Sequence, residues 1–189
     1  MVPDTVLRSV ESTMEAATGK PIRIMKTSPV GGGCINPSAR LESVGGDQFF
    51  LKWNTASPPE MFFAEADGLE ALAGPGTVRI PHVLGEGGSG THADPGWLLL
   101  EFIPQGRPGS DYGRRLGEGL AALHSAGSTA SSTGAPPSFG WHRDNFIGSL
   151  PQGNEPDSDW IDFWRDRRLE PQLRMARDRG HFLGGAGRV

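Results

Sequence analysis

A run of three glycines, Gly31 to Gly33, constrains the fold more than any other feature of the sequence. An alternating segment, "IRIMKTSPV" at 22–30, precedes it, and two strand-like segments, "ARLESV" and "QFFLKWN", follow it. These two flank the turn "GGD" at 45–47, which predicts a β-hairpin. Because glycine has no Cβ, its backbone N–H groups can approach phosphate oxygens closely. The pattern therefore predicts strands joined by a glycine loop that is suited to an anion.

Apolar periodicity predicts six further elements. They are helices at 4–18, 58–74, 111–127 and 158–180 and strands at 79–87 and 96–104. We expect Asp4 to cap the first helix and Gly19 to end it. Pro59 suits the first turn of the second helix, and Pro171 is expected to break or kink the last one.

The order of these elements predicts an α+β protein with two lobes. A β-rich first lobe with one inserted helix spans residues 1–103, and a partial helical lobe spans 104–189. The net charge of −4 argues against nucleic-acid binding. No apolar run is long enough for a membrane span, and the N-terminus lacks a signal-peptide core. A soluble, cytoplasmic protein is the expectation.

Three further features point to nucleotide chemistry. Lys52 lies among apolar residues of a predicted strand, where an ammonium group needs a partner, and Glu65 on the next helix can supply one. The strand ending in "LLLEFIP" exposes backbone groups at its end, which can hydrogen-bond an adenine edge. The glycine run, Lys52 and Glu65 each have an ordinary alternative: a flexible turn, a solvated strand lysine and a solvated helix glutamate, respectively. Their conjunction, in the order that phosphoryl transfer requires, favours a kinase-type nucleotide lobe.

The chain resembles the fructosamine (ketosamine-3-) kinase family, which has an aminoglycoside-phosphotransferase-like, protein-kinase-like fold. The resemblance covers about residues 20–180 and includes "GGGCIN", "FFLKWN", "FIGSLPQGN" and "DWIDFWRDRRLEPQL". It implies that Gly31, Gly32 and Gly33 cover the ATP phosphates, that Lys52 holds them, and that Glu65 orients Lys52. It also implies an adenine hinge at Glu101, Phe102 and Ile103.

The reaction implied by the resemblance is phosphorylation by MgATP of a sugar hydroxyl on a glycated amine, either small or protein-bound. The phosphate destabilises the adduct, which amounts to deglycation. The family places its catalytic base and its Mg²⁺ ligands in an "HGD…N" loop and a later Asp. Only "HFLGGAGRV" follows Gly180, so no catalytic or metal residue can be assigned. We expect a C-terminally truncated member with weak or no activity. The alternatives are a kinase of the aminoglycoside or choline type and a non-catalytic nucleotide-binding module.

Two smaller hypotheses remain. The letters "HRDN" resemble a kinase catalytic loop, but Asn145 directly follows Asp144, whereas that loop places its Asn five residues after the Asp. Asp144 and Asn145 are therefore candidate contacts for the sugar acceptor, or polar residues of a structural turn. Cys34 is the sole cysteine, so a disulfide would link two chains. The chain is accordingly expected to be a monomer or a Cys34-linked dimer.

Overall fold

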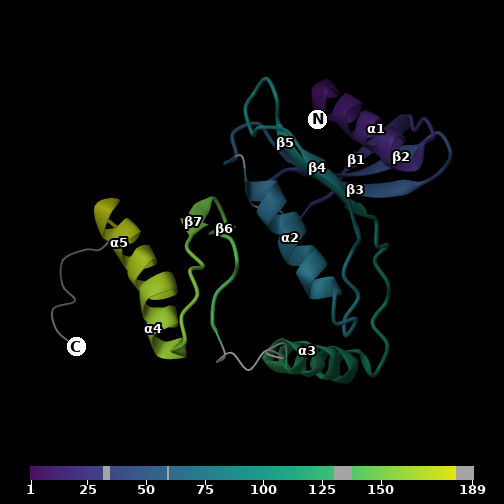
Figure 1. The fold of residues 1–189 in the computed structure, drawn as a ribbon. Helices are drawn as coiled ribbons and strands as arrows, with labels where there is room; N and C mark the ends of the chain where they lie inside the picture. Colours follow the sequence, from purple (N-terminus) through teal and green to yellow (C-terminus); the bar gives the residue numbers. More distant parts are fainter. Residues whose placement is uncertain (32–34, 59, 130–137, 182–189) are drawn as a thin grey trace. The chain divides into compact units, whose positions relative to one another are not determined.

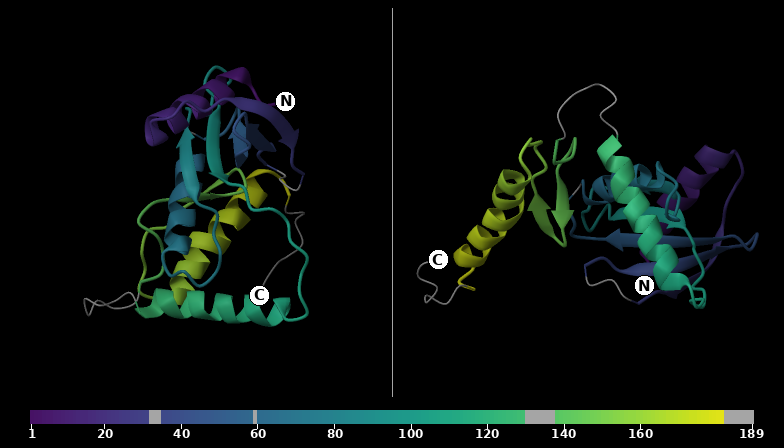
Figure 2. Two further views of the ribbon diagram at one scale, coloured as in Figure 1. Left: turned by 90° about the vertical axis from the view of Figure 1, so that its right-hand side faces the viewer. Right: turned by 90° about the horizontal axis from the view of Figure 1, so that it is seen from below.

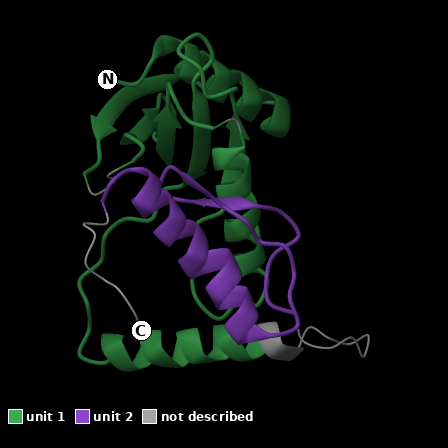
Figure 3. Cartoon of the chain, turned by 90° about the vertical axis from the view of Figure 1, so that its left-hand side faces the viewer, with its two compact units in different colours: residues 1–130 green, residues 131–189 purple. Residues whose placement is uncertain are grey.

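The computed structural model describes residues 1–31, 35–58, 60–129 and 138–181. They fall into two compact units, Met1–Ala130 and Ser131–Val189 (Figure 3). The predicted division into lobes after residue 103 remains a prediction. None of the described helices is long and apolar enough to cross a bilayer.

The first unit contains a five-stranded sheet (Figure 1). Its strands are β1 (Ile24–Pro29), β2 (Ser38–Ser43), β3 (Gln48–Asn54), β4 (Val83–Gly87) and β5 (Gly96–Glu101). They lie in the order β1-β2-β3-β5-β4, and each neighbouring pair is antiparallel. The predicted hairpin is confirmed as β2 and β3. Its turn contains Gly46, whose φ of 88° lies in the left-handed region that favours glycine.

Helix α1 (Asp4–Thr18) packs on one face of this sheet. The apolar core there comprises Val6, Val10, Met14, Leu41, Leu51, Trp53, Trp97 and Leu99, all buried. The prediction that Asp4 caps the helix is wrong: Pro3 is the N-cap, and Asp4 is the first helical residue. An acidic group in the first turn still complements the helix dipole. Gly19 ends the helix with φ of 67°, as predicted.

Helix α2 (Met61–Ala73) packs on the opposite face of the sheet (Figure 2). Its contacts form a second, smaller core of Phe62, Ala66, Leu98 and Leu100. Successive strand residues point to opposite faces. Because Leu51 and Trp53 point into the α1 core, Phe50 and Lys52 lie on the α2 face.

Helix α3 (Tyr112–Thr129) follows the sheet and contains four glycines. One of them, Gly119, lies against the segment that leads to β4. A Cβ at this position would lie 2.8 Å from Val78 Cγ1 and 3.1 Å from the Thr77 carbonyl oxygen. Glycine therefore allows this helix to approach the 77–78 backbone closely.

The second unit holds a short hairpin and a helix. The hairpin consists of β6 (Asn145–Ile147) and β7 (Leu150–Gln152). The helix runs through α4 (Trp160–Trp164), a π-helical turn η1 (Arg165–Leu169) and α5 (Glu170–Asp178).

The expectation that Pro171 breaks or kinks the helix is met only in part: the chain stays helical through Pro171, in the first turn of α5, but the π-helical turn η1 interrupts the α-helix just before it. Proline has no N–H to donate to the carbonyl group four residues earlier, at Arg167. That carbonyl accepts a hydrogen bond of 3.0 Å from the Arg168 side chain instead. The π-helical turn thus leads into the proline without ending the helix.

Candidate nucleotide-binding site

The structure brings Lys52 of β3 and Glu65 of α2 together as an ion pair. Lys52 Nζ donates to Glu65 Oε1 at 2.6 Å and to Oε2 at 2.8 Å. The two side chains are 25% and 31% exposed. The strand register places Lys52 between Ser38 of β2 and Leu98 of β5. A lysine in such a position is held in one orientation by the carboxylate, and its remaining donor capacity is available to a ligand.

A cavity of about 510 Å³ lies within the first unit at the end of the sheet. It is lined by Ser28, Pro29, Val30, Arg40, Phe50, Pro81, Leu100, Glu101, Phe102, Ile103 and Gln105. These residues come from β1, β2, β3 and β5 and from the segments after β1, before β4 and after β5. The volume falls in the range of small-molecule sites, about 300–1,000 Å³. The three predicted hinge residues, Glu101, Phe102 and Ile103, therefore line one cavity.

Glu101 has its side chain and its N–H occupied within the protein. Its carboxylate binds Arg79, and mainly this hydrogen bond lowers the pKa of Glu101 from its ordinary value. Its backbone N–H donates to the carbonyl of His82 at 2.9 Å. Within the described residues, the N–H groups of Phe102 and Ile103 make no hydrogen bond. Of the three predicted hinge residues, these two therefore keep a backbone donor that no described residue uses.

The glycine run lies between β1 and β2, as predicted. Gly31 is described, whereas Gly32, Gly33 and Cys34 lie outside the described residues. Two hydrogen bonds close the base of this connection: Val30 N–H donates to the Ser38 carbonyl at 3.0 Å, and Ser38 Oγ donates to the Val30 carbonyl at 2.9 Å.

Two asparagines near the glycine run were not predicted from the sequence. Asn36 is 8% exposed, and its Oδ1 accepts from Asn54 Nδ2 at 2.8 Å. Asn36 Nδ2 also contacts the sulfur of Met61 at 3.5 Å. Asn54 stands two residues after Lys52 on β3. The segment that follows the glycine run is thus fixed to the strand of the site lysine and to the start of α2.

Asp144 and Asn145 belong to the second unit, where both make local contacts. Asp144 Oδ1 accepts from the backbone N–H of Asn154 at 2.8 Å, and Asn145 Oδ1 accepts from Gln152 Nε2 at 2.9 Å. Asn154 is 2% exposed, and Arg168 Nη2 donates to its Oδ1 at 2.6 Å. These contacts favour the structural-turn interpretation of Asp144. The sequence pattern did not single out Asn154 or Arg168.

Metal ligands do not gather in the described part of the chain. No group of three or more His, Cys, Asp or Glu side chains is placed there to hold a cation. The residues that the structure describes therefore supply no complete Mg²⁺ site.

Comparison with known proteins places this geometry in context. The sequence profile of the fructosamine kinase family matches residues 6–189. A probable ketoamine kinase of Synechocystis is 41% identical over 177 residues, which are 93% of this chain and 56% of the relative. The chloroplastic protein-ribulosamine 3-kinase of Arabidopsis thaliana is 41% identical over 165 residues, 85% of this chain and 46% of the relative. The chain thus spans about half the length of these curated relatives.

Solved structures give the same assignment for the fold. A candidate fructosamine-3-kinase of Haemophilus somnus has a TM-score of 0.78 at 24% identity, over 93% of this chain and 56% of that one. A candidate fructosamine-3-kinase of Thermobifida fusca has a TM-score of 0.71 at 30% identity, over 94% and 57%. The predicted α+β, kinase-like fold class is therefore confirmed. The chain belongs to the fructosamine kinase family.

Proposed function

We propose that this chain carries the nucleotide-binding part of a ketosamine 3-kinase, an ATP-dependent phosphotransferase that acts on glycated amines. The observation that carries the proposal is the Lys52–Glu65 ion pair on the same sheet face as a cavity lined by residues 101–103. Family membership supports ATP as the nucleotide, because the relatives are named as kinases. Their printed names, ketoamine kinase and protein-ribulosamine 3-kinase, support a sugar–amine acceptor.

Each described group has a place in this proposal. The adenine of ATP lies in the cavity, where the backbone N–H of Ile103 is available to hydrogen-bond the edge of the adenine ring. Lys52 provides a compact positive charge for the phosphates, and Glu65 holds it in place. Gly31 to Gly33 are proposed to cover the phosphates. Mg²⁺, when bound, neutralises phosphate charge. The described residues offer no cluster of three or more His, Cys, Asp or Glu side chains to hold it.

A non-catalytic nucleotide-binding module is the second candidate, and one observation favours it. The sequence contains no "HGD" followed by the Asn of the family's catalytic loop. The polypeptide of residues 1–189 is therefore proposed to bind ATP and to transfer little or no phosphate by itself. The cytoplasmic location, and a monomeric or Cys34-linked dimeric state, remain proposals from the sequence.

ATP binding tests the proposed nucleotide site, and phosphate transfer separately tests the proposed inactivity of the polypeptide. Titration calorimetry should detect ATP binding by the wild type, and Lys52→Ala should weaken it by about 10- to 100-fold, the value of a charge-assisted contact. Lys26→Ala, on an exposed residue of β1, is the matched control and should bind normally. No binding at millimolar ATP would refute the nucleotide site. Transfer to a fructosyl- or ribulosyl-lysine peptide at roughly 1–100 per second would refute the inactivity of the polypeptide.

A further inference from the structure

Arg40 lies in the wall of the cavity, and the proposed function assigns it no role. It is on β2, directly opposite Phe50 of β3 in the strand register. Because Phe50 packs against the α2 core, Arg40 is on the sheet face that also carries Lys52. Both Arg40 and Phe50 line the cavity. An arginine on this face therefore reaches the same space as the hinge residues.

Arg40 is half-buried, and its side chain lies against an aromatic ring. The central carbon of its guanidinium lies 5.7 Å from the centroid of the Phe102 ring. Across the described residues, it has no hydrogen bond and no ion pair. The acidic residue in the cavity wall, Glu101, is bound to Arg79 instead. A guanidinium carries five N–H donors, and withdrawing them from water without acceptors is unfavourable. A ligand in the cavity can supply both acceptors and a second flat surface.

The register indicates which part of a nucleotide Arg40 meets. Ser38 is opposite Lys52, and Arg40 is two residues further along β2, opposite Phe50. Two strand residues span roughly 6.6 Å. On β5, Leu100 is opposite Phe50 and leads directly into Glu101 and Phe102. Lys52 thus stands at the phosphate level of the site, whereas Arg40 stands at the level of the hinge, where the base binds.

We propose that Arg40 is a base-binding residue that gives the site its preference for purine nucleotides. This inference rests on the proposed nucleotide function. The guanidinium packs between the Phe102 ring and the bound base, as a cation against an aromatic face. A purine has a larger face than a pyrimidine and extends far enough from the hinge to cover the guanidinium. A pyrimidine is smaller and leaves Arg40 largely uncovered.

Affinities of a ligand series test this assignment. Arg40→Ala should weaken ATP, ADP and adenosine by a common factor of about 5- to 30-fold, because the lost contact is to the base. Inorganic tripolyphosphate, which has no base, should bind the variant and the wild type equally. The ratio of ATP to CTP affinity should fall in the variant. Arg40→Lys keeps the charge without the planar group, so it should lose most of the same factor.

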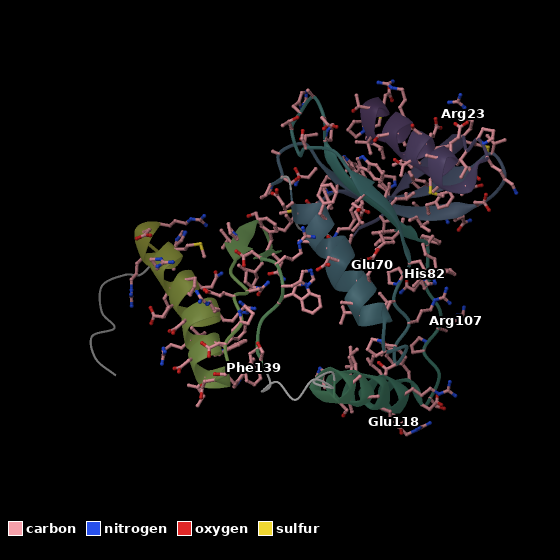
Figure 4. All side chains as sticks on the ribbon, in the orientation of Figure 1. Arg23, Glu70, His82, Arg107, Glu118 and Phe139 are labelled. Carbon is pink, nitrogen blue, oxygen red and sulfur yellow. The ribbon has the colours of Figure 1, made fainter. Side chains whose placement is uncertain are left out.

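The control variant is Arg23→Ala. Arg23 is an arginine next to α1 whose side chain is 78% exposed and paired with Glu11 (Figure 4). Arg23→Ala should leave the affinities for all five ligands unchanged. Thermal unfolding of each variant establishes that it is folded, and Arg40→Lys provides the test if Arg40→Ala is not.

Two results would overturn the inference and leave the nucleotide site intact: unchanged ATP affinity in Arg40→Ala, or an equal loss for ATP and tripolyphosphate. Failure of the wild type to bind ATP would instead overturn the proposed function itself.

Discussion

The Lys52–Glu65 pair should be energetically coupled, and a double-mutant cycle can measure the coupling. Two geometric facts set its size. The ammonium contacts both carboxylate oxygens, at 2.6 and 2.8 Å, and the side chains are about three-quarters and two-thirds covered, with 25% and 31% exposed. Fully exposed pairs contribute about 0.2–1 kcal/mol, whereas removing one partner of a buried pair costs about 3–5 kcal/mol. A partly covered, bidentate pair should lie between these limits, with a coupling of about 1.5 kcal/mol.

The variants are Lys52→Met, Glu65→Gln and the double substitution. Each single variant leaves one charge partly covered without its partner, so each should destabilise the first unit by about 2 kcal/mol. The double variant leaves no such charge, and it should cost about 1.5 kcal/mol less than the sum of the two. Amide hydrogen exchange of Leu51 and Leu99, buried strand residues of the α1 core, reports this unit alone.

Additivity would refute this reasoning. If the double variant equals the sum of the single variants within about 0.5 kcal/mol, the pair contributes nothing as a unit. The salt dependence provides an independent check. Because the pair is mostly covered, raising the salt concentration to 1 M should reduce the coupling only in part.

Three further outcomes are expected. Leu41→Ala should destabilise the first unit by about 2–5 kcal/mol in denaturant because Leu41 is fully buried, while Val44→Ala, at 70% exposure, should change it by less than about 0.5 kcal/mol; equal losses would contradict the assigned core. Asp159→Ala should cost about 1 kcal/mol, since its carboxylate caps α4 by accepting from two backbone N–H groups, and unchanged exchange of those amides would contradict the cap. The Arg79 hydrogen bond lowers the pKa of Glu101 below its ordinary value of 4.5, so Glu101→Gln should be less stable than wild type above pH 4.5. That gap should close as pH falls through the lowered pKa, and a gap that stays constant down to pH 3 would refute the assignment.

Much of the first unit could be predicted because its sequence patterns are long and regular. Along β3, alternate residues are buried in the α1 core, and this period of two separates Leu51 from Lys52 without knowledge of the fold. The pairing of Lys52 with Glu65 followed from residue type and order, since a lysine on a covered strand face needs a counter-charge. The polar asparagine contact behind the glycine run carried no periodic signal. It joins residues 18 positions apart, so it appears only once the strands are placed.

The second unit was harder to predict because its elements are short. Strands β6 and β7 have three residues each, too few to show alternation. The available signal was Gly148, whose φ of 62° suits the two-residue turn between them. The contact of Arg168 with Asn154 spans 14 residues and joins a helix to a loop. Arg40 illustrates the same limit in the first unit: its place in the cavity depends on the register with Phe50, which the sequence alone does not fix.

Amide chemical shifts during a titration with ATP test the nucleotide site most directly. ATP should shift the amides of Gly31, Lys52 and Ile103, which lie on the glycine connection, the α2 face of the sheet and the hinge. The amides of α1, which covers the opposite face, should move little and serve as the internal control. A set of shifts confined to α1, or no shifts at millimolar ATP, would contradict a nucleotide site at the hinge of this sheet.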